Sequence, residues 1–209
     1  YKAPLKALVH FPESPFDPFG NEVFWDQKLK HFGFGSGDDT IMTAPVSIDI
    51  VAHEYAHAIL FNKFSMGNHI THDTATLRYQ AGAIHEGVAD IFSTLVRKHA
   101  FGIVDWVIGD AVVIPAQTDL LPRDLAHPEN TLPPQALYYN NTASNWDTTA
   151  QAIYNHAGIV AKWFYLLADG GTGFNYATDS ITVEPLTIDT AEMVLIKGLD
   201  TLSRDSIKI

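Results

Sequence analysis

Residues 47–63, SIDIVAHEYAHAILFNK, place His53 and His57 four positions apart and Glu54 directly after the first of them. Pro45 precedes this stretch and a Ser-Met-Gly-Asn turn signal comes soon after it, so the sequence predicts a helix over residues 47–63. Residues at positions i and i+4 lie on one face of a helix, so the two imidazoles can bind one metal ion. Apolar and aromatic residues recur at helical spacing and indicate that the helix is packed within the fold: Ile48, Ala52, Tyr55, Ala56, Ile59 and Leu60.

Glu54 is placed by the same helix to act on a metal ligand rather than as one. It projects roughly 100° around the helix from His53, which puts its carboxylate beside a bound ion. There it can accept a proton from a metal-bound water. The alternative is a surface helix with two solvated histidines. Apolar residues nearly all round the helix disfavour that alternative, because buried His and Glu side chains need polar partners or a metal.

A catalytic zinc site needs a third protein ligand and an open fourth position. Residues 53–57 have the pattern His-Glu-x-x-His (HExxH). Two common extensions of this pattern supply a later histidine or a later glutamate as the third ligand. Both are absent here, because Lys63 stands at the histidine position and Thr76 at the glutamate position. The remaining candidate is Glu86 in residues 82–90, GAIHEGVAD, with Asp90 one helical turn later on the same face. A solvated helix face is the alternative. The apolar residues of this segment predict burial and therefore favour a ligand: Ile84, Val88, Ile91, Phe92 and Leu95.

The rest of the chain predicts a mixed architecture. Pro and Gly recur through residues 1–40, which favours short strands and turns over a long helix. Further helices are predicted over about residues 81–99, 155–169 and 190–202. Residues 114–150 contain five prolines and predict a long irregular connection, of a kind that is usually functional inside a compact domain.

These elements predict an α+β fold of two lobes. We expect residues 1–66 to form a small N-terminal lobe that contains β-strands and ends in the metal-binding helix. Residues 67–209 are expected to form a mainly α-helical C-terminal lobe that supplies the third ligand. The chain of 209 residues is 46% hydrophobic and 18% charged, enough for a sizeable core.

Composition also excludes several classes of function. The formal charge of −11 disfavours nucleic acid and anionic lipid as partners, because both require a basic face. No apolar run is long enough to span a membrane. The absence of cysteine excludes disulfides, thiolate zinc sites and cysteine nucleophiles. The first residues show no signal peptide, which is compatible with numbering that begins inside a longer precursor.

The motifs quoted above, taken together, resemble the thermolysin-like (gluzincin) family of zinc metallopeptidases. The resemblance covers roughly residues 21–202 and is specific at the two zinc motifs and looser elsewhere. It implies a zincin-like fold with the cleft and the zinc between the two lobes. It also implies one catalytic zinc bound by His53, His57 and Glu86, with Glu54 as the general base.

The resemblance assigns further residues around the metal. Asp90 corresponds to the partner of the first ligand histidine, and Arg123 to the arginine that holds the substrate carbonyl. Tyr79 resembles a tyrosine that helps to hold the oxyanion, and Phe24-Trp25 resembles the edge strand that binds substrate. The positions that line the primary apolar pocket of the family correspond to Ile50, Ile108 and Val112.

The proton donor of the family is altered in this chain. The family has a histidine four residues before the glycine of the third helix, and Tyr154 stands at that position relative to Gly158. A histidine occurs two residues later, at His156. Alignment favours Tyr154 as the donor to the oxyanion, and residue type favours His156. We prefer His156, because a donor that can be protonated can also give a proton to the leaving amine.

The paired-calcium site of the family is also altered. It corresponds to Asp49, Arg97, Asp105, Val107 and Asp110. Because Arg97 and Val107 replace two carboxylates, we expect calcium binding to be reduced or absent. The Arg97 guanidinium should instead pair with one of the three aspartates.

The resemblance implies a zinc-dependent endopeptidase that prefers a hydrophobic residue after the cleaved bond. Its partners would be a protein or peptide substrate and a removed propeptide, and its location secreted or in the cell envelope. Two alternatives stay open: a catalytically impaired, zinc-stabilised binding module and a metallo-aminopeptidase. The chain is short on both sides of the family pattern, as expected of a fragment or a trimmed member. His69 and His72 are a candidate pair for a second metal.

Overall fold

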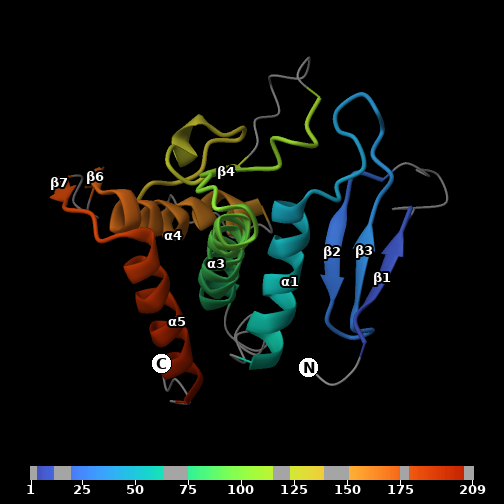
Figure 1. The fold of residues 1–209 in the computed structure, drawn as a ribbon, viewed down its shortest axis with the longest axis horizontal. Helices are drawn as coiled ribbons and strands as arrows, with labels where there is room; N and C mark the ends of the chain where they lie inside the picture. The colour runs from blue at the N-terminus through green and yellow to red at the C-terminus, as the bar shows by residue number, and fades with distance from the viewer. Residues whose placement is uncertain are drawn as a thin grey trace.

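The computed structural model describes residues 4–11, 20–63, 75–114, 123–138, 151–174 and 179–204. A three-stranded sheet lies at one side of the molecule, and helix α1 (Ile48–Lys63) separates it from the long helix α3 (Ala75–Phe101) (Figure 1). The strand order is β1-β3-β2, with β1 parallel and β2 antiparallel to β3. The strands are β1 Lys6–Val9, β2 Val23–Asp26 and β3 His31–Phe34.

Aromatic side chains fix the sheet against α1. Trp25 of β2 is paired in register with Phe32 of β3, and their ring centroids lie 4.6 Å apart. Phe32 and Phe34 share one face of β3 because successive residues of a strand alternate between faces. With Ala58 of α1 they form a small buried cluster. This packing holds β2, the edge strand nearest α1, alongside the HExxH helix (Figure 1).

The remaining helices form the larger part of the molecule. Helix α4 (Gln151–Asp169) crosses α3, and α5 (Ile188–Arg204) packs against α4 (Figure 1). Two short antiparallel pairs and one 3-10 turn complete the described elements: β4 Val107–Ile108 with β5 Arg123–Asp124, β6 Gly171–Phe174 with β7 Ser180–Val183, and η1 Pro128–Asn130. The main core joins α1, α3, α4 and α5: Leu60, Val88, Ile91, Leu95, Ile108, Leu125, Ala161, Phe164, Ala168, Ala191, Leu195 and Leu199.

Small residues allow α3 and α4 to approach closely. A Cβ atom at Gly82 would lie 2.9 Å from the Ile153 side chain, and one at Gly87 would lie 2.7 Å from the Ala157 carbonyl oxygen. A larger residue at Gly87 would require the helices to move apart, because the contact is with backbone, whereas at Gly82 the Ile153 side chain would have to shift. The crossing therefore brings the N-terminal half of α4 next to the metal-binding segment of α3.

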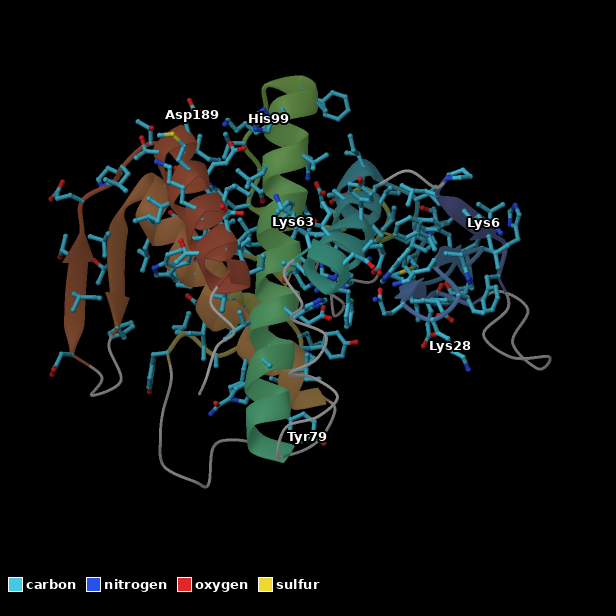
Figure 2. The ribbon with its side chains drawn as sticks, turned by 90° about the horizontal axis from the view of Figure 1, so that it is seen from below. Lys6, Lys28, Lys63, Tyr79, His99 and Asp189 are labelled. Atoms are coloured by element: carbon cyan, nitrogen blue, oxygen red, sulfur yellow. The ribbon has the colours of Figure 1, made fainter. Side chains whose placement is uncertain are left out.

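Helix α5 is tied to the far end of α3 by charged side chains. Lys98 contacts Asp189 and lies 3.0 Å from Glu192, and His99 lies 2.8 Å from the same glutamate. Figure 2 shows His99 and Asp189 together at this end, with Tyr79 at the opposite end of α3.

The expected α+β class, with a small β-containing part and a mainly helical part, is confirmed. Two helices begin earlier than expected: α3 at Ala75 rather than about 81, and α4 at Gln151 rather than about 155. Neither added stretch contains Gly or Pro, so nothing in it stops a helix that tertiary packing extends. The expected lobe boundary at residue 66 lies outside the described residues. None of the described helices is long and apolar enough to cross a membrane.

Arg97, near the C-terminal end of α3, is surrounded by carboxylates. Its guanidinium lies 2.7 Å from Asp105, 3.4 Å from Asp110 and 3.7 Å from Asp49, and it donates to the Val107 carbonyl oxygen at 3.0 Å. Asp49 is buried in the first turn of α1 and also accepts the backbone N–H of Gly109 at 2.8 Å. The expected pairing of Arg97 with these aspartates is therefore observed.

Replacing Arg97 by Met should destabilise the protein by about 2–4 kcal/mol, because the buried Asp49 carboxylate would lose its positive partner. The partly exposed Asp105 and Asp110 add less, because water screens them. Urea unfolding measures the change, and Arg97→Lys is the matched control that keeps the charge without the planar fork.

With Arg97 paired to these aspartates, we expect calcium to be dispensable for stability. The melting temperature of the wild type should be the same in calcium and in a calcium-selective chelator, whereas Arg97→Met should gain stability from calcium. A wild-type shift of several degrees would contradict the replacement of the ion by the guanidinium.

Candidate metal centre and cleft

The packing of α1 on α3 brings the three expected metal-binding side chains together. Nε2 of His53 lies 3.2 Å from Oε2 of Glu86, and Nε2 of His57 lies 3.4 Å from Oε1 of the same carboxylate. The ligand atoms all lie within 4.8 Å of one another. The planes of the two imidazoles are at 86° to each other, and their centroids lie 4.5 Å apart. Each ring directs its Nε2 toward the carboxylate.

The donor set fits a zinc ion. Two imidazole nitrogens and one carboxylate oxygen are ligands that catalytic zinc sites use, with a fourth position left open. Within the described ranges, no further histidine or carboxylate joins this group. Burial opposes ionisation of Glu86, but the hydrogen bond from His53 and the positive charge of Arg123 hold its pKa well below the usual range. The Arg123 guanidinium lies 3.6 Å from this carboxylate, and a metal ion among the three ligand atoms would add a closer positive charge.

Asp90 and Arg123 extend the cluster behind the ligands. Oδ1 of Asp90 lies 2.9 Å from Nδ1 of His53 and 2.9 Å from Nη1 of Arg123, which is also 3.6 Å from Glu86. These contacts have ion-pair distances without the alignment of hydrogen bonds. Burial and Arg123 lower the pKa of His53, but its contacts with Asp90 and Glu86 outweigh them and raise it to about 9. Asp90 therefore directs the Nδ1 proton of His53 away from the metal position.

The three metal-binding side chains line a cleft of about 340 Å³ between the sheet, α1, α3 and the start of α4. Strand β2 forms one wall, and its outer edge is unpaired in the described sheet. The cleft is lined by Val23, Phe24, Trp25, His53, Glu54, His57, Phe61, Gly82, His85, Glu86, Arg123, Ile153 and Tyr154.

Glu54 lies in this cleft beside the ligands and is only 6% exposed. Burial raises the pKa of its carboxyl group, and a hydrogen bond from the Trp25 backbone N–H opposes that rise. The residue that follows the first ligand histidine is therefore held by α1 on one side and β2 on the other.

Tyr154 and His156 differ in where α4 directs them. Tyr154 lines the cleft and is 48% exposed, and the negative charge of Glu86 raises the pKa of its phenol. Nδ1 of His156 lies 2.7 Å from the Ala152 carbonyl oxygen of the same helix, and this histidine does not line the cleft. The helix is regular from Gln151 onward, so no bulge turns His156 toward the metal. The geometry favours Tyr154, against the sequence-based preference for His156.

Other predicted residues are not brought to the cleft. Tyr79 lies in α3 rather than in a loop, two turns before Glu86 and near the N-terminal end of the helix (Figure 2). Ile108 and Val112 are buried in the fold, and neither they nor Ile50 line the cleft. The pocket-lining role of Ile50, Ile108 and Val112 and the catalytic role of Tyr79 stay predictions.

His69 and His72, the candidate pair for a second metal, lie outside the described residues. His85 is a cleft residue that the sequence did not single out. Its Nδ1 lies 2.9 Å from Nδ1 of His57, and the side chain is 2% exposed. Burial lowers the pKa of His85 to about 4. The sequence signal for His85 was a histidine in an apolar segment, directly before the predicted ligand Glu86. Its contact with His57 could be found only in the three-dimensional structure.

An HExxH helix, a carboxylate from the next long helix and the open edge of a small sheet together define a zincin-like protein. Two family models match the chain: the catalytic domain of thermolysin metallopeptidases over residues 3–60 and their alpha-helical domain over residues 75–206. The second match alone spans more than half of the chain, so the protein belongs to the thermolysin metallopeptidase family.

Individual relatives agree with this assignment. Bacillolysin from Bacillus cereus is 29% identical over 186 residues, which is 88% of this chain and 29% of that protein. Thermolysin from Alicyclobacillus acidocaldarius is 30% identical over 183 residues, 86% of this chain and 30% of that protein. The chain thus spans about three tenths of the length of these relatives. The precursor of protealysin, a metalloproteinase from Serratia proteamaculans, shares the fold with a TM-score of 0.61 at 21% identity, covering 96% of this chain and 66% of that one.

Proposed function

We propose that the protein is a zinc-dependent endopeptidase in which His53, His57 and Glu86 hold one zinc ion and Glu54 is the general base. The convergence of the three ligand atoms within 4.8 Å, with the Glu54 carboxylate beside them, is the observation that carries the proposal. Zinc in this position would lower the pKa of a water molecule in its open site and polarise the peptide carbonyl. A zinc-binding module without activity would not require the buried Glu54 carboxylate.

The chain's own residues would perform the remaining steps. Glu54 takes a proton from the attacking water and passes it to the leaving amine. Arg123, held against Asp90, binds the carbonyl oxygen of the substrate. Tyr154 donates its phenolic proton in a hydrogen bond to the developing oxyanion, which it can do at neutral pH without a change of charge.

The substrate would bind as an extended peptide along the open edge of β2, because main-chain groups of a peptide can pair with an unpaired strand edge. Phe24, Phe61 and Ile153 give the cleft an apolar wall, which supports a preference for hydrophobic side chains near the cleaved bond.

We also propose that the protein acts outside the cell or in the cell envelope and is released from a propeptide. Family membership supports the location, and the likeness to a solved structure described as a precursor supports the propeptide.

Metal analysis and a protease assay test this function together. The purified protein should contain one zinc per molecule and cleave internal peptide bonds of casein. A zinc chelator should abolish cleavage, and added zinc should restore it. Release of single residues from short peptides with a free amino terminus would instead indicate an aminopeptidase. A protein that binds zinc but cleaves neither substrate would be a binding module.

A further inference from the structure

The side chain of His85 occupies a position that the proposed reaction does not use. We infer that His85 is a positioning residue for the metal site: its neutral imidazole accepts a hydrogen bond from His57 and so directs the other nitrogen of His57 toward the metal. This inference rests on the proposed function, because it presupposes zinc at the cluster.

The tautomer of each ring follows from the distances. Nε2 of His57 is the atom that faces Glu86, at 3.4 Å, and belongs to the group of three ligand atoms. A nitrogen that binds a metal carries no proton, so the ring proton of His57 must be on Nδ1. That Nδ1 lies 2.9 Å from Nδ1 of His85, which must therefore accept. The proton of His85 is then on its Nε2.

Packing holds the two rings in this arrangement. Their planes are parallel within 5° and their centroids lie 4.7 Å apart. The ring of Phe61 packs on His85 with centroids 4.6 Å apart. Because His85 is in the middle of α3 and almost completely buried, neither ring can rotate without displacing its neighbours.

The two ligand histidines consequently have different partners. The Nδ1 of His53 faces the carboxylate of Asp90 at 2.9 Å, whereas that of His57 faces an uncharged imidazole. Glu54, Glu86 and Asp90 already place three carboxylates around the site, with Arg123 as the nearby cation. A further carboxylate at position 85 would add negative charge in a buried region. An imidazole acceptor orients His57 without adding that charge.

The arrangement leaves one atom unsatisfied. Nε2 of His85 is buried and has no hydrogen-bond partner in the described part of the chain. A buried polar atom without a partner destabilises the folded state. His85 is therefore a poor choice for packing alone, and its contact with His57 explains why an imidazole is useful there.

Replacing His85 by Phe separates the two roles. Phe keeps an aromatic ring but removes both the acceptor and the unsatisfied Nε2. Zinc affinity, measured by competition with a chromophoric chelator, should fall about 10–100-fold, the usual effect of losing the partner of a ligand histidine. The melting temperature of the metal-free protein should change little, because removal of the unsatisfied Nε2 offsets the loss of the acceptor for His57.

A second acceptor-free variant, His85→Leu, guards against misfitting of the larger ring and should lose zinc affinity likewise. His85→Asn offers a carbonyl oxygen to His57 and should retain most of the wild-type affinity. His127→Phe removes an exposed histidine away from the metal cleft and should change neither quantity. Long-range proton–nitrogen NMR of the zinc-loaded protein should show the ring protons on Nδ1 of His57 and Nε2 of His85.

Wild-type zinc affinity in both His85→Phe and His85→Leu would overturn the inference and leave the proposed function standing. So would acceptor-free variants whose metal-free form is destabilised while the folded protein binds zinc normally, since that pattern belongs to a packing residue. A wild-type protein that does not bind zinc would overturn the inference and the proposed function together.

Discussion

Replacing Glu54 by Gln is expected to abolish peptide hydrolysis while zinc stays bound. The amide has nearly the same shape as the carboxylate, so the packing between α1 and β2 should survive. It cannot accept a proton from water, however, and removal of a general base typically lowers the rate about 10²–10⁴-fold. Burial raises the pKa of the Glu54 carboxyl group, which brings its basicity closer to what proton transfer near neutral pH requires.

The measurement is kcat/KM on an internally quenched peptide, together with zinc content by atomic absorption. Glu129→Gln is the matched control, because Glu129 lies on the exposed 3-10 turn after β5, outside the metal cleft. The control should keep wild-type activity. Near-normal turnover by Glu54→Gln with a full complement of zinc would show that another group takes the proton.

The metal cluster could be predicted from the sequence because its geometry is largely local. His53 and His57 are one helical turn apart, as are Glu86 and Asp90, so each pair shares a helix face wherever the helix lies. Helical periodicity does not predict that these two helix faces pack against each other. Apolar residues around both motifs indicated burial, and two buried polar faces need each other or a metal.

The walls of the cleft could not be predicted in the same way. Phe61 comes from α1 and Ile153 from α4, and the position of α4 depends on its close packing against α3 at Gly82 and Gly87. The role expected of Ile108 and Val112 stays a prediction: both are buried, and neither lines this cleft. Orientation depends on the path of the whole segment, and no local pattern records it.

The Arg97 cluster was less predictable than the metal cluster and more predictable than the walls of the cleft. The family resemblance placed Arg97 among three aspartates, and charge complementarity then predicted that the guanidinium would pair with them. The distances to Asp49, Asp105 and Asp110 agree. His85 was missed for the opposite reason: a neutral histidine has no obligatory partner of opposite charge that a sequence could reveal.

The choice of oxyanion donor leads to the second large effect. Replacing Tyr154 by Phe should lower kcat about 10²–10³-fold, the usual consequence of removing one donor to a developing oxyanion. KM and zinc content should change little, because the hydroxyl group acts mainly in the transition state. His156→Ala should cost less than about tenfold, since its imidazole already contacts the Ala152 carbonyl oxygen and does not line the cleft.

The pair of variants decides between the two residues by one comparison of kcat on the same peptide substrate. Tyr138→Phe, which removes the hydroxyl group of a tyrosine away from the metal cleft, is the matched control for the loss of a phenol. If His156→Ala causes the larger loss, then the start of α4 must rearrange when substrate binds. If neither change lowers kcat tenfold, the zinc ion and Arg123 alone stabilise the oxyanion, and the exposed phenol at the mouth of the cleft has another role. The regular helical geometry from Gln151 onward is the reason to expect the loss at Tyr154: it places that residue, and not one half a turn later, over the ligands.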